Sequence, residues 1–129
     1  MIAILGAGKM GEALLSGMLR AGMPTADVVV SARRAERAEL LAERYGVRVL
    51  TSRQAANQAD VLLVTVKPQD IDVLVDEIAD AVGPGTLLVS FAAGIPTAYY
   101  EKRLPEGSPV VRVMTNTPAL VDEAMSTYR

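Results

Sequence analysis

The sequence contains no cysteine, no histidine and no tryptophan, and its aromatic residues are four tyrosines and one phenylalanine. Without cysteine or histidine the chain lacks thiol chemistry, disulfides, histidine acid–base catalysis and zinc sites of the usual ligand types, so we expect no metal ion. With so few aromatic side chains, the core must consist of Val, Leu, Ile, Ala and Met. That composition is typical of a buried parallel sheet flanked by helices.

Other absences concern partners and location. The chain has no basic run and a formal net charge of −2, which argues against binding to nucleic acid or to a membrane surface. No apolar run approaches the ~20 residues that a transmembrane helix needs. The first expected strand begins at Met1 or Ile2, so we expect no signal peptide and a cytoplasmic protein. The length of 129 residues corresponds to one domain, residues 1–129.

Apolar runs of strand length alternate with patterns of helical spacing along the whole chain. This alternation predicts an α/β fold of Rossmann type, a doubly wound and mainly parallel sheet with flanking helices. The alternative is a flavodoxin-type α/β domain with another ligand. We expect Ser52 to cap the third helix and residues 123–129 to begin a further strand. The expected strands are 1–5, 28–30, 47–50, 61–66, 87–89 and 110–114, and the expected helices are 10–21, 38–45, 54–58, 68–78 and 96–104.

A glycine motif of the form G-x-G-x-x-G follows the first expected strand and opens the first expected helix. Gly6 would permit a tight turn, Gly8 would let a diphosphate approach the backbone, and Gly11 would let helix and strand pack closely. The free N–H groups of the helix would then face the anion. The alternative is a plain glycine-rich turn. The cofactor contacts predicted in this loop are Gly6, Ala7, Gly8, Lys9 and Met10.

The end of the second expected strand bears on the choice of cofactor. An NAD-binding domain usually has Asp or Glu there, bonded to the ribose 2′-hydroxyl. Here the chain has Ser31, Arg33 and Arg34, which supply a hydroxyl and two cations suited to a phosphate. The pattern favours NADP(H). The alternative is a solvated surface turn whose arginines pair with Glu36 or Glu39.

Segments after the fourth, fifth and sixth expected strands complete the predicted cofactor site. Ligands of an open α/β sheet bind beyond the carboxyl ends of its strands. Small residues after the fifth strand leave room for a flat ring or a ribose, and an Asn-Thr pair after the sixth can bond an amide. Each segment alone is more typical of a tight turn or a helix start. The predicted contacts are Val66, Lys67, Pro68, Ala92, Ala93, Gly94, Asn116 and Thr117.

Lys67 has two possible interpretations. Its ammonium group could protonate or anchor a substrate, or its side chain could be solvated while only its backbone lines the site. We favour the second, because most lysines are exposed. The sequence thus identifies no catalytic residue.

These segments, in this order, resemble pyrroline-5-carboxylate reductase. The resemblance covers essentially all 129 residues. Two departures are Lys9, where Asn is more usual, and Thr115, where many bacterial members have Pro. The matching segments are residues 6–10 (Gly-Ala-Gly-Lys-Met), 31–33 (Ser-Ala-Arg), 66–69 (Val-Lys-Pro-Gln), 92–95 (Ala-Ala-Gly-Ile) and 112–119 (Arg-Val-Met-Thr-Asn-Thr-Pro-Ala).

The resemblance implies an oxidoreductase that reduces the imine 1-pyrroline-5-carboxylate to proline with NADPH, the last step of proline biosynthesis. Members of the family are about twice as long, and their second half is a helical domain that forms a dimer and supplies much of the imine pocket. We expect residues 123–129 to lead toward that absent domain, the full-length protein to be a homo-oligomer built on dimers, and this chain alone to be a poor reductase. The alternatives are a deazaflavin-linked NADP reductase, a 3-hydroxyacid dehydrogenase and a non-catalytic NADP-binding module.

Overall fold

A computed structural model describes residues 1–83, 85–92, 94–105 and 107–113 of the chain. Its described residues form a single six-stranded sheet in which every pair of neighbouring strands is parallel. The strand order is β3-β2-β1-β4-β5-β6. The strands are β1 (Ile2–Leu5), β2 (Val28–Ser31), β3 (Arg48–Val49), β4 (Val61–Val64), β5 (Leu87–Ser90) and β6 (Val110–Arg112).

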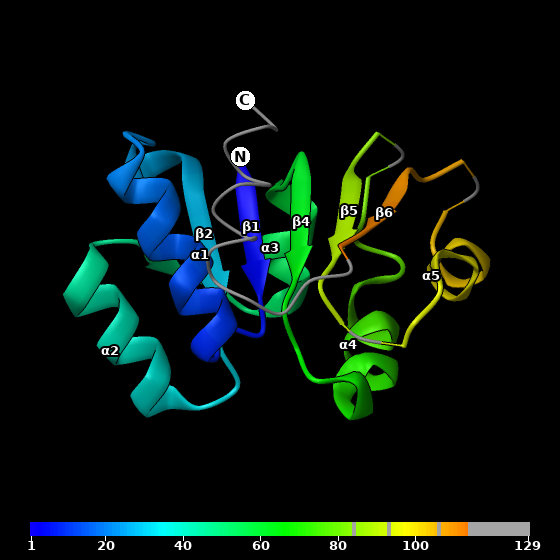
Figure 1. Ribbon diagram of the computed structural model, residues 1–129, viewed down its shortest axis with the longest axis horizontal. Helices are drawn as coiled ribbons and strands as arrows, with labels where there is room; N and C mark the ends of the chain where they lie inside the picture. Colours follow the sequence, from blue (N-terminus) through cyan, green and yellow to red (C-terminus); the bar gives the residue numbers. More distant parts are fainter. Residues whose placement is uncertain (84, 93, 106, 114–129) are drawn as a thin grey trace.

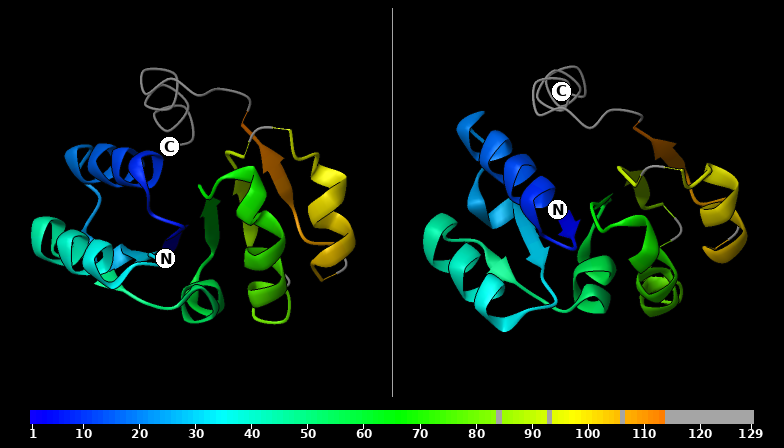
Figure 2. Two further views of the ribbon diagram at one scale, coloured as in Figure 1. Left: turned by 90° about the horizontal axis from the view of Figure 1, so that it is seen from below. Right: turned by 60° about the horizontal axis from the view of Figure 1, so that its bottom comes forward.

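Helices cover both faces of this sheet (Figure 1). The helices α1 and α2 pack on one face, and α3, α4 and α5 pack on the other, which the rotated views also show (Figure 2). The helices are α1 (Lys9–Arg20), α2 (Ala35–Tyr45), α3 (Ser52–Gln58), α4 (Ile71–Ile78) and α5 (Thr97–Arg103), with short 3₁₀ turns η1 (Thr25–Asp27) and η2 (Pro68–Asp70).

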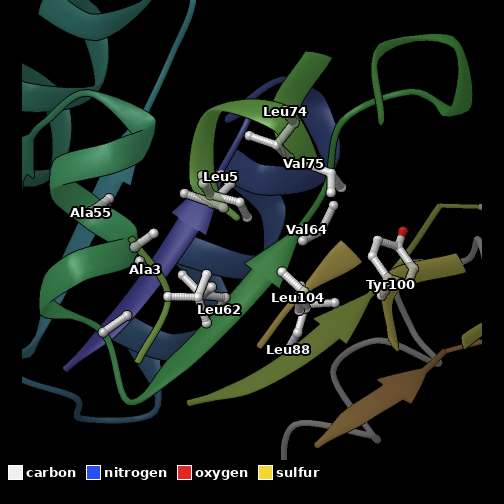
Figure 3. Packing of buried hydrophobic residues seen from close by; sticks show 14 of the residues in the cluster. Ala3, Leu5, Ala55, Leu62, Val64, Leu74, Val75, Leu88, Tyr100 and Leu104 are labelled. Carbon is white, nitrogen blue, oxygen red and sulfur yellow. The ribbon is translucent and has the colours of Figure 1, made fainter. Parts of the chain in front are cut away.

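The core is divided by the sheet into two layers, because successive side chains of a strand point to opposite faces. In β4, Leu62 packs into the layer beneath α3, α4 and α5, whereas Leu63 packs into the layer beneath α1 and α2. Figure 3 shows Leu62 in the first layer, close to Ala3 on β1 and Leu88 on β5. Strands that are buried on both faces require nearly continuous apolar sequence, as observed here.

The strand order creates a crevice at one edge of the sheet. The chain runs from β1 outward to β2 and β3, then returns to the other side of β1 for β4, β5 and β6. Loops that follow β1 and β4 therefore diverge toward opposite faces, and ligands of open α/β sheets bind at such a switch point. This edge lies at the bottom of the sheet in Figure 1. The predicted α/β fold of Rossmann type is confirmed.

Two details of the expected elements were wrong. The fourth strand ends at Val64 rather than at residue 66, because Thr65 donates its hydroxyl to the carbonyl oxygens of Leu5 and Gly6 and the chain turns there. The cap of α3 is Thr51 rather than Ser52: the Thr51 hydroxyl accepts from the Gln54 N–H, and the Gln54 side chain accepts from the Thr51 N–H.

The remaining strand and helix predictions agree with the structure to within one to three residues at their described ends. The strand expected at residues 123–129 lies outside the described residues. No helix within the described part of the chain combines the length and the hydrophobicity of a membrane-spanning segment.

Candidate functional site at the carboxyl ends of the strands

An open groove of about 770 Å³ lies at the switch point of the sheet, and we call it the strand-end groove. Loops after β1, β2, β4 and β5 form its walls. Its volume is within the range of small-molecule and cofactor sites. The predicted site residues that line it are Gly6, Ala7, Gly8, Lys9, Met10, Arg33, Arg34, Val66, Lys67, Pro68 and Ala92.

Five predicted contacts are not among the residues that line this groove, and Ser31 is described below. Gly94 is exposed and does not line the strand-end groove. Ala93, Asn116 and Thr117 lie outside the described residues, so their predicted contacts stay predictions.

The glycine loop is shaped by the two glycines that meet close neighbours. Gly6 has φ = +76°, a left-handed conformation that side chains rarely adopt, and a Cβ there would collide with the side chain of Val66. A Cβ at Gly11 would lie 3.0 Å from Thr65 Oγ1 and 3.2 Å from Ile4 Cγ2. These contacts explain why α1 can begin directly against the sheet.

The amino terminus of α1 opens into the strand-end groove. Its N-cap residue is Gly8, which has no side chain to cap the first turn. No protein acceptor among the described residues binds the backbone N–H groups of Lys9 and Met10. A Cβ at Gly8 would meet only the Gly6 carbonyl oxygen, at 3.9 Å, so the space beside it is open. Unpaired N–H groups at a helix amino terminus, with an unobstructed approach, are suited to binding an anion.

A group of hydrogen bonds between α1 and α2 holds this loop in place, and it was not predicted from the sequence. Arg37 donates from Nε to the Ala7 carbonyl oxygen at 3.0 Å and from Nη2 to the Gly8 carbonyl oxygen at 3.1 Å. The same guanidinium bonds Glu12 at 2.6 Å. Because Arg37 binds the carbonyl oxygens of Ala7 and Gly8, the loop presents its N–H groups to the groove. The only sequence signal was an arginine one helical turn after the Arg33-Arg34 pair.

Glu12 is the acceptor at the centre of this group. It also accepts from the Tyr45 hydroxyl at 2.7 Å and from Arg44 at 2.9 Å. These bonds, that from Tyr45 above all, lower the pKa of Glu12 and outweigh the opposite effect of burial. The hydrogen bond to Glu12, together with burial, raises the pKa of Tyr45. Arg37 and Arg44 thereby compensate the negative charge of Glu12, in the first turn of α1, in the protein without a bound anion.

The end of the groove at β2 is positively charged. Residues 31–34 contain no carboxylate, and Arg33, Arg34 and Arg37 all line the groove. The alternative pairing of these arginines with Glu36 or Glu39 is not observed among the described residues. Arg33 instead forms an ion pair with Asp70.

Ser31 lies beneath the loop rather than in the open groove. Its side chain is buried, and its hydroxyl oxygen is 3.3 Å from both the Gly6 nitrogen and the Ser52 hydroxyl oxygen. Its carbonyl also accepts from the N–H groups of Gly6 and Ala7. Ser31, Thr51 and Ser52 line a second cavity of about 230 Å³ that adjoins the groove at Gly6, Ala32, Arg33 and Val66. The hydroxyls of Thr51 and Ser52 were not predicted as part of the site.

Beyond β5, a buried hydrogen bond supports the segment that contains Ala92. The Tyr100 hydroxyl lies 2.6 Å from the Ser90 hydroxyl, which accepts from the Ala92 N–H at 3.3 Å. Burial raises the pKa of Tyr100, against the smaller opposite effect of the Ser90 bond. Tyr100 is therefore a neutral structural group here.

Lys67 is exposed and lines the groove, so both interpretations of its side chain stay predictions. Its carbonyl accepts from the Asp70 N–H, which begins the 3₁₀ turn before α4. Within the described residues no three acidic side chains come together as a metal site, and the sequence has no His or Cys.

Comparisons with known proteins agree with this architecture. The family model described as "NADP oxidoreductase coenzyme F420-dependent" matches residues 1–94. The chain is 44% identical over 126 residues to a pyrroline-5-carboxylate reductase of Mycobacterium tuberculosis, covering 93% of this chain and 43% of that protein. It also matches the structure of a pyrroline-5-carboxylate reductase from Coxiella burnetii, with a TM-score of 0.84 and 32% identity over 93% of this chain and 45% of the other.

A second similar structure is an imine reductase from Myxococcus stipitatus in complex with NADP⁺, with a TM-score of 0.74 and 25% identity, covering 93% of this chain and 43% of the other. The chain thus spans less than half the length of these relatives. The similarity to pyrroline-5-carboxylate reductase that the motifs indicated is confirmed. Because the family model matches 94 of the 129 residues, this chain belongs to the NADP oxidoreductase family described as coenzyme F420-dependent.

Proposed function

We propose that this chain binds NADP(H) in the strand-end groove and forms the cofactor domain of an enzyme that reduces 1-pyrroline-5-carboxylate to proline. The observation that carries the cofactor proposal is the composition of the groove: the N–H groups of Lys9 and Met10 are unpaired at the start of α1, and residues 31–34 at the end of β2 supply Arg33 and Arg34 and no carboxylate. The substrate proposal rests on the relatives, since pyrroline-5-carboxylate reductases are 40–44% identical over most of this chain.

The residues present fit a phosphorylated dinucleotide. The diphosphate would lie against the N–H groups of Lys9 and Met10, where Gly8 leaves space. The 2′-phosphate would be bound by Arg33 and Arg34 at the end of β2, where an NAD-binding domain would use an acid. Ser31 acts beneath the loop and holds Gly6 in place. The ribose and nicotinamide would extend toward the loops after β4 and β5.

The described residues contribute binding and orientation rather than an acid or a base. Bound NADPH supplies a hydride, and a protonated imine is the better acceptor. The groove contributes charge and geometry that hold the two reactants together. No buried, unpaired titratable side chain lines the described groove. We therefore propose that the proton and the substrate contacts come from residues outside the described part of the chain or from a second subunit. In cellular terms this would be a cytoplasmic enzyme of proline biosynthesis.

The cofactor proposal is tested by calorimetric titration of the chain with NADPH and with NADH. NADPH should bind more tightly, and Arg33→Ala should cost NADPH about 1–3 kcal/mol, the scale of a charge-assisted hydrogen bond, while NADH binding hardly changes. Arg20→Ala, at the far end of α1, is the matched control and should change neither affinity. Equal affinities for the two cofactors would contradict the proposal.

The reaction is tested by proline formation from 1-pyrroline-5-carboxylate and NADPH, for this chain and for the full open reading frame that encodes it. We expect turnover in the second case and little in the first. Oxidation of NADPH by a deazaflavin instead of the imine would favour the other activity that the family description names.

A further inference from the structure

An ion pair crosses the strand-end groove. Arg33 Nη1 lies 3.2 Å from Asp70 Oδ1, although the two residues are 37 positions apart in the sequence. Arg33 follows β2, Asp70 ends the 3₁₀ turn after β4, and β1 lies between those two strands. Neighbouring strands are about 4.8 Å apart, so the ends of β2 and β4 are separated by roughly 10 Å. The pair thus spans the carboxyl end of β1, where the glycine loop begins.

We propose that Asp70 sets how strongly the groove distinguishes phosphorylated from unphosphorylated dinucleotides, by competing with the 2′-phosphate for Arg33. The inference rests on the proposed function, because it requires NADP(H) as the ligand. Both side chains line the groove, so a bound dinucleotide meets them together. In the free protein the cation that would bind the phosphate is already paired with a carboxylate of this chain.

Charge and exposure decide which anion Arg33 binds. The side chains of Arg33 and Asp70 are 55% and 36% exposed, and ion pairs of such exposure are weak. A phosphate monoester carries close to two negative charges and three acceptor oxygens, so it displaces a single carboxylate. The carboxylate of Asp70 nevertheless stays beside the bound phosphate and repels it. Both effects weaken binding of NADPH, and neither applies to NADH, which has a hydroxyl at that position.

Asp70 could instead help NADPH by orienting the Arg33 guanidinium toward the groove. Asp70→Asn separates the two roles, because asparagine keeps an acceptor oxygen for Arg33 and removes only the charge. If orientation dominates, the variant binds NADPH no better than the unmodified chain. If competition dominates, as we infer, the variant binds NADPH more tightly.

The test is a calorimetric titration of the unmodified chain and of Asp70→Asn with NADPH and with NADH at low ionic strength. Asp70→Asn should tighten NADPH binding roughly three- to tenfold, the scale of one exposed charge interaction, and change NADH binding less than twofold. The NADPH gain should shrink at high salt. Asp76→Asn is the matched control: it changes the net charge equally from an exposed position on α4 outside the groove, and should leave both affinities unchanged.

A second arm repeats the substitution in an Arg33→Ala background. In that background the increase in NADPH affinity caused by Asp70→Asn should fall by at least half on a logarithmic scale. The reason is that the Arg33 guanidinium, for which Asp70 and the 2′-phosphate compete, is absent. An equal gain for NADPH and NADH, a weaker NADPH complex, or an undiminished gain without Arg33 would each overturn the inference. If the unmodified chain does not prefer NADPH, the proposed function fails; if it does and Asp70→Asn changes nothing, this inference alone fails.

Discussion

At the scale of single residues, the glycines of the loop have different tasks. Gly11 is required by packing, since a Cβ there would lie 3.0–3.3 Å from side-chain atoms of Thr65, Ile4 and Ala7. Gly8 has open space beside it, so we expect its lack of a side chain to serve an incoming ligand rather than the fold. The sequence motif assigned these roles to the same positions, and the structure supplies the contacts that distinguish them.

Gly11→Ala and Gly8→Ala should therefore fail in different ways. Gly11→Ala should lower the free energy of unfolding by about 1–3 kcal/mol, the usual cost of overpacking. Gly8→Ala should leave the unfolding free energy nearly unchanged and weaken NADPH binding at least tenfold, because the methyl group occupies the approach of the diphosphate. Urea unfolding and cofactor titration of both variants make the comparison. A Gly8→Ala variant that binds NADPH normally would mean that the loop is only a turn.

At the scale of elements, the junction of α1 and α2 depends on one carboxylate. Glu12 on α1 accepts from Arg37, Arg44 and Tyr45 on α2, and its side chain is only 19% exposed. Glu12 thus joins α1 and α2, which pack on the same face of the sheet, at a point beside the glycine loop that Arg37 binds. Sequence patterns predict each helix separately, because a 3.6-residue period reports on one helix and not on which partner it meets.

This junction should make stability depend on pH. The pKa of Glu12 is lowered in the folded protein, so its contribution is complete above the ordinary glutamate pKa of about 4.3 and is lost as pH falls through the lower folded pKa. Glu12→Gln should reduce the unfolding free energy at pH 7 by about 1–2 kcal/mol, the scale of hydrogen bonds to a charged group, and by less at pH 4. Urea unfolding at both pH values measures the difference.

Glu39→Gln, an exposed carboxyl of α2 outside this junction, is the control and should keep the pH dependence of the unmodified chain. If Glu12→Gln unfolds with the same pH dependence as the unmodified chain, the Glu12 carboxylate does not stabilise the junction.

At the scale of the whole molecule, one sheet carries two core layers and a groove at its switch point. Leu62 and Leu63 are neighbours in β4, yet each belongs to a different layer and both are nearly inaccessible. Because the central strands β1, β2, β4 and β5 contribute to both layers, loss of one layer leaves the other with an exposed sheet. We therefore expect both layers to unfold together.

Leu62→Ala and Leu63→Ala should each lower the unfolding free energy by about 2–5 kcal/mol, the cost of a large-to-small change in a packed core. Each variant should still unfold in one transition. Far-UV circular dichroism reports on helices of both layers, while tyrosine fluorescence reports on Tyr45 in one layer and on Tyr99 and Tyr100 in the other. A second transition in either signal would show that the layers unfold independently.

Much of this protein follows from local sequence. Alternating strand and helix patterns determine the α/β class, the glycine spacing predicts where an anion can approach, and the lack of an acid after β2 indicates the phosphorylated cofactor. These features are readable because each depends on neighbours within a few residues, through side-chain period, backbone conformation or a helix amino terminus. Most predicted contacts that the structure describes do line one groove.

Only the tertiary structure decided which distant groups meet. The strand order placed Asp70 beside Arg33 and set Arg37 against the carbonyls of the glycine loop, contacts across 37 and about 30 residues that no periodicity records. It also turned the Ser31 side chain inward, where its hydroxyl lies within hydrogen-bond distance of the Gly6 N–H. A sequence determines which elements form because their energetics are local. The pairing of charges at the groove depends on which strands lie side by side, and that is set by packing of the whole sheet.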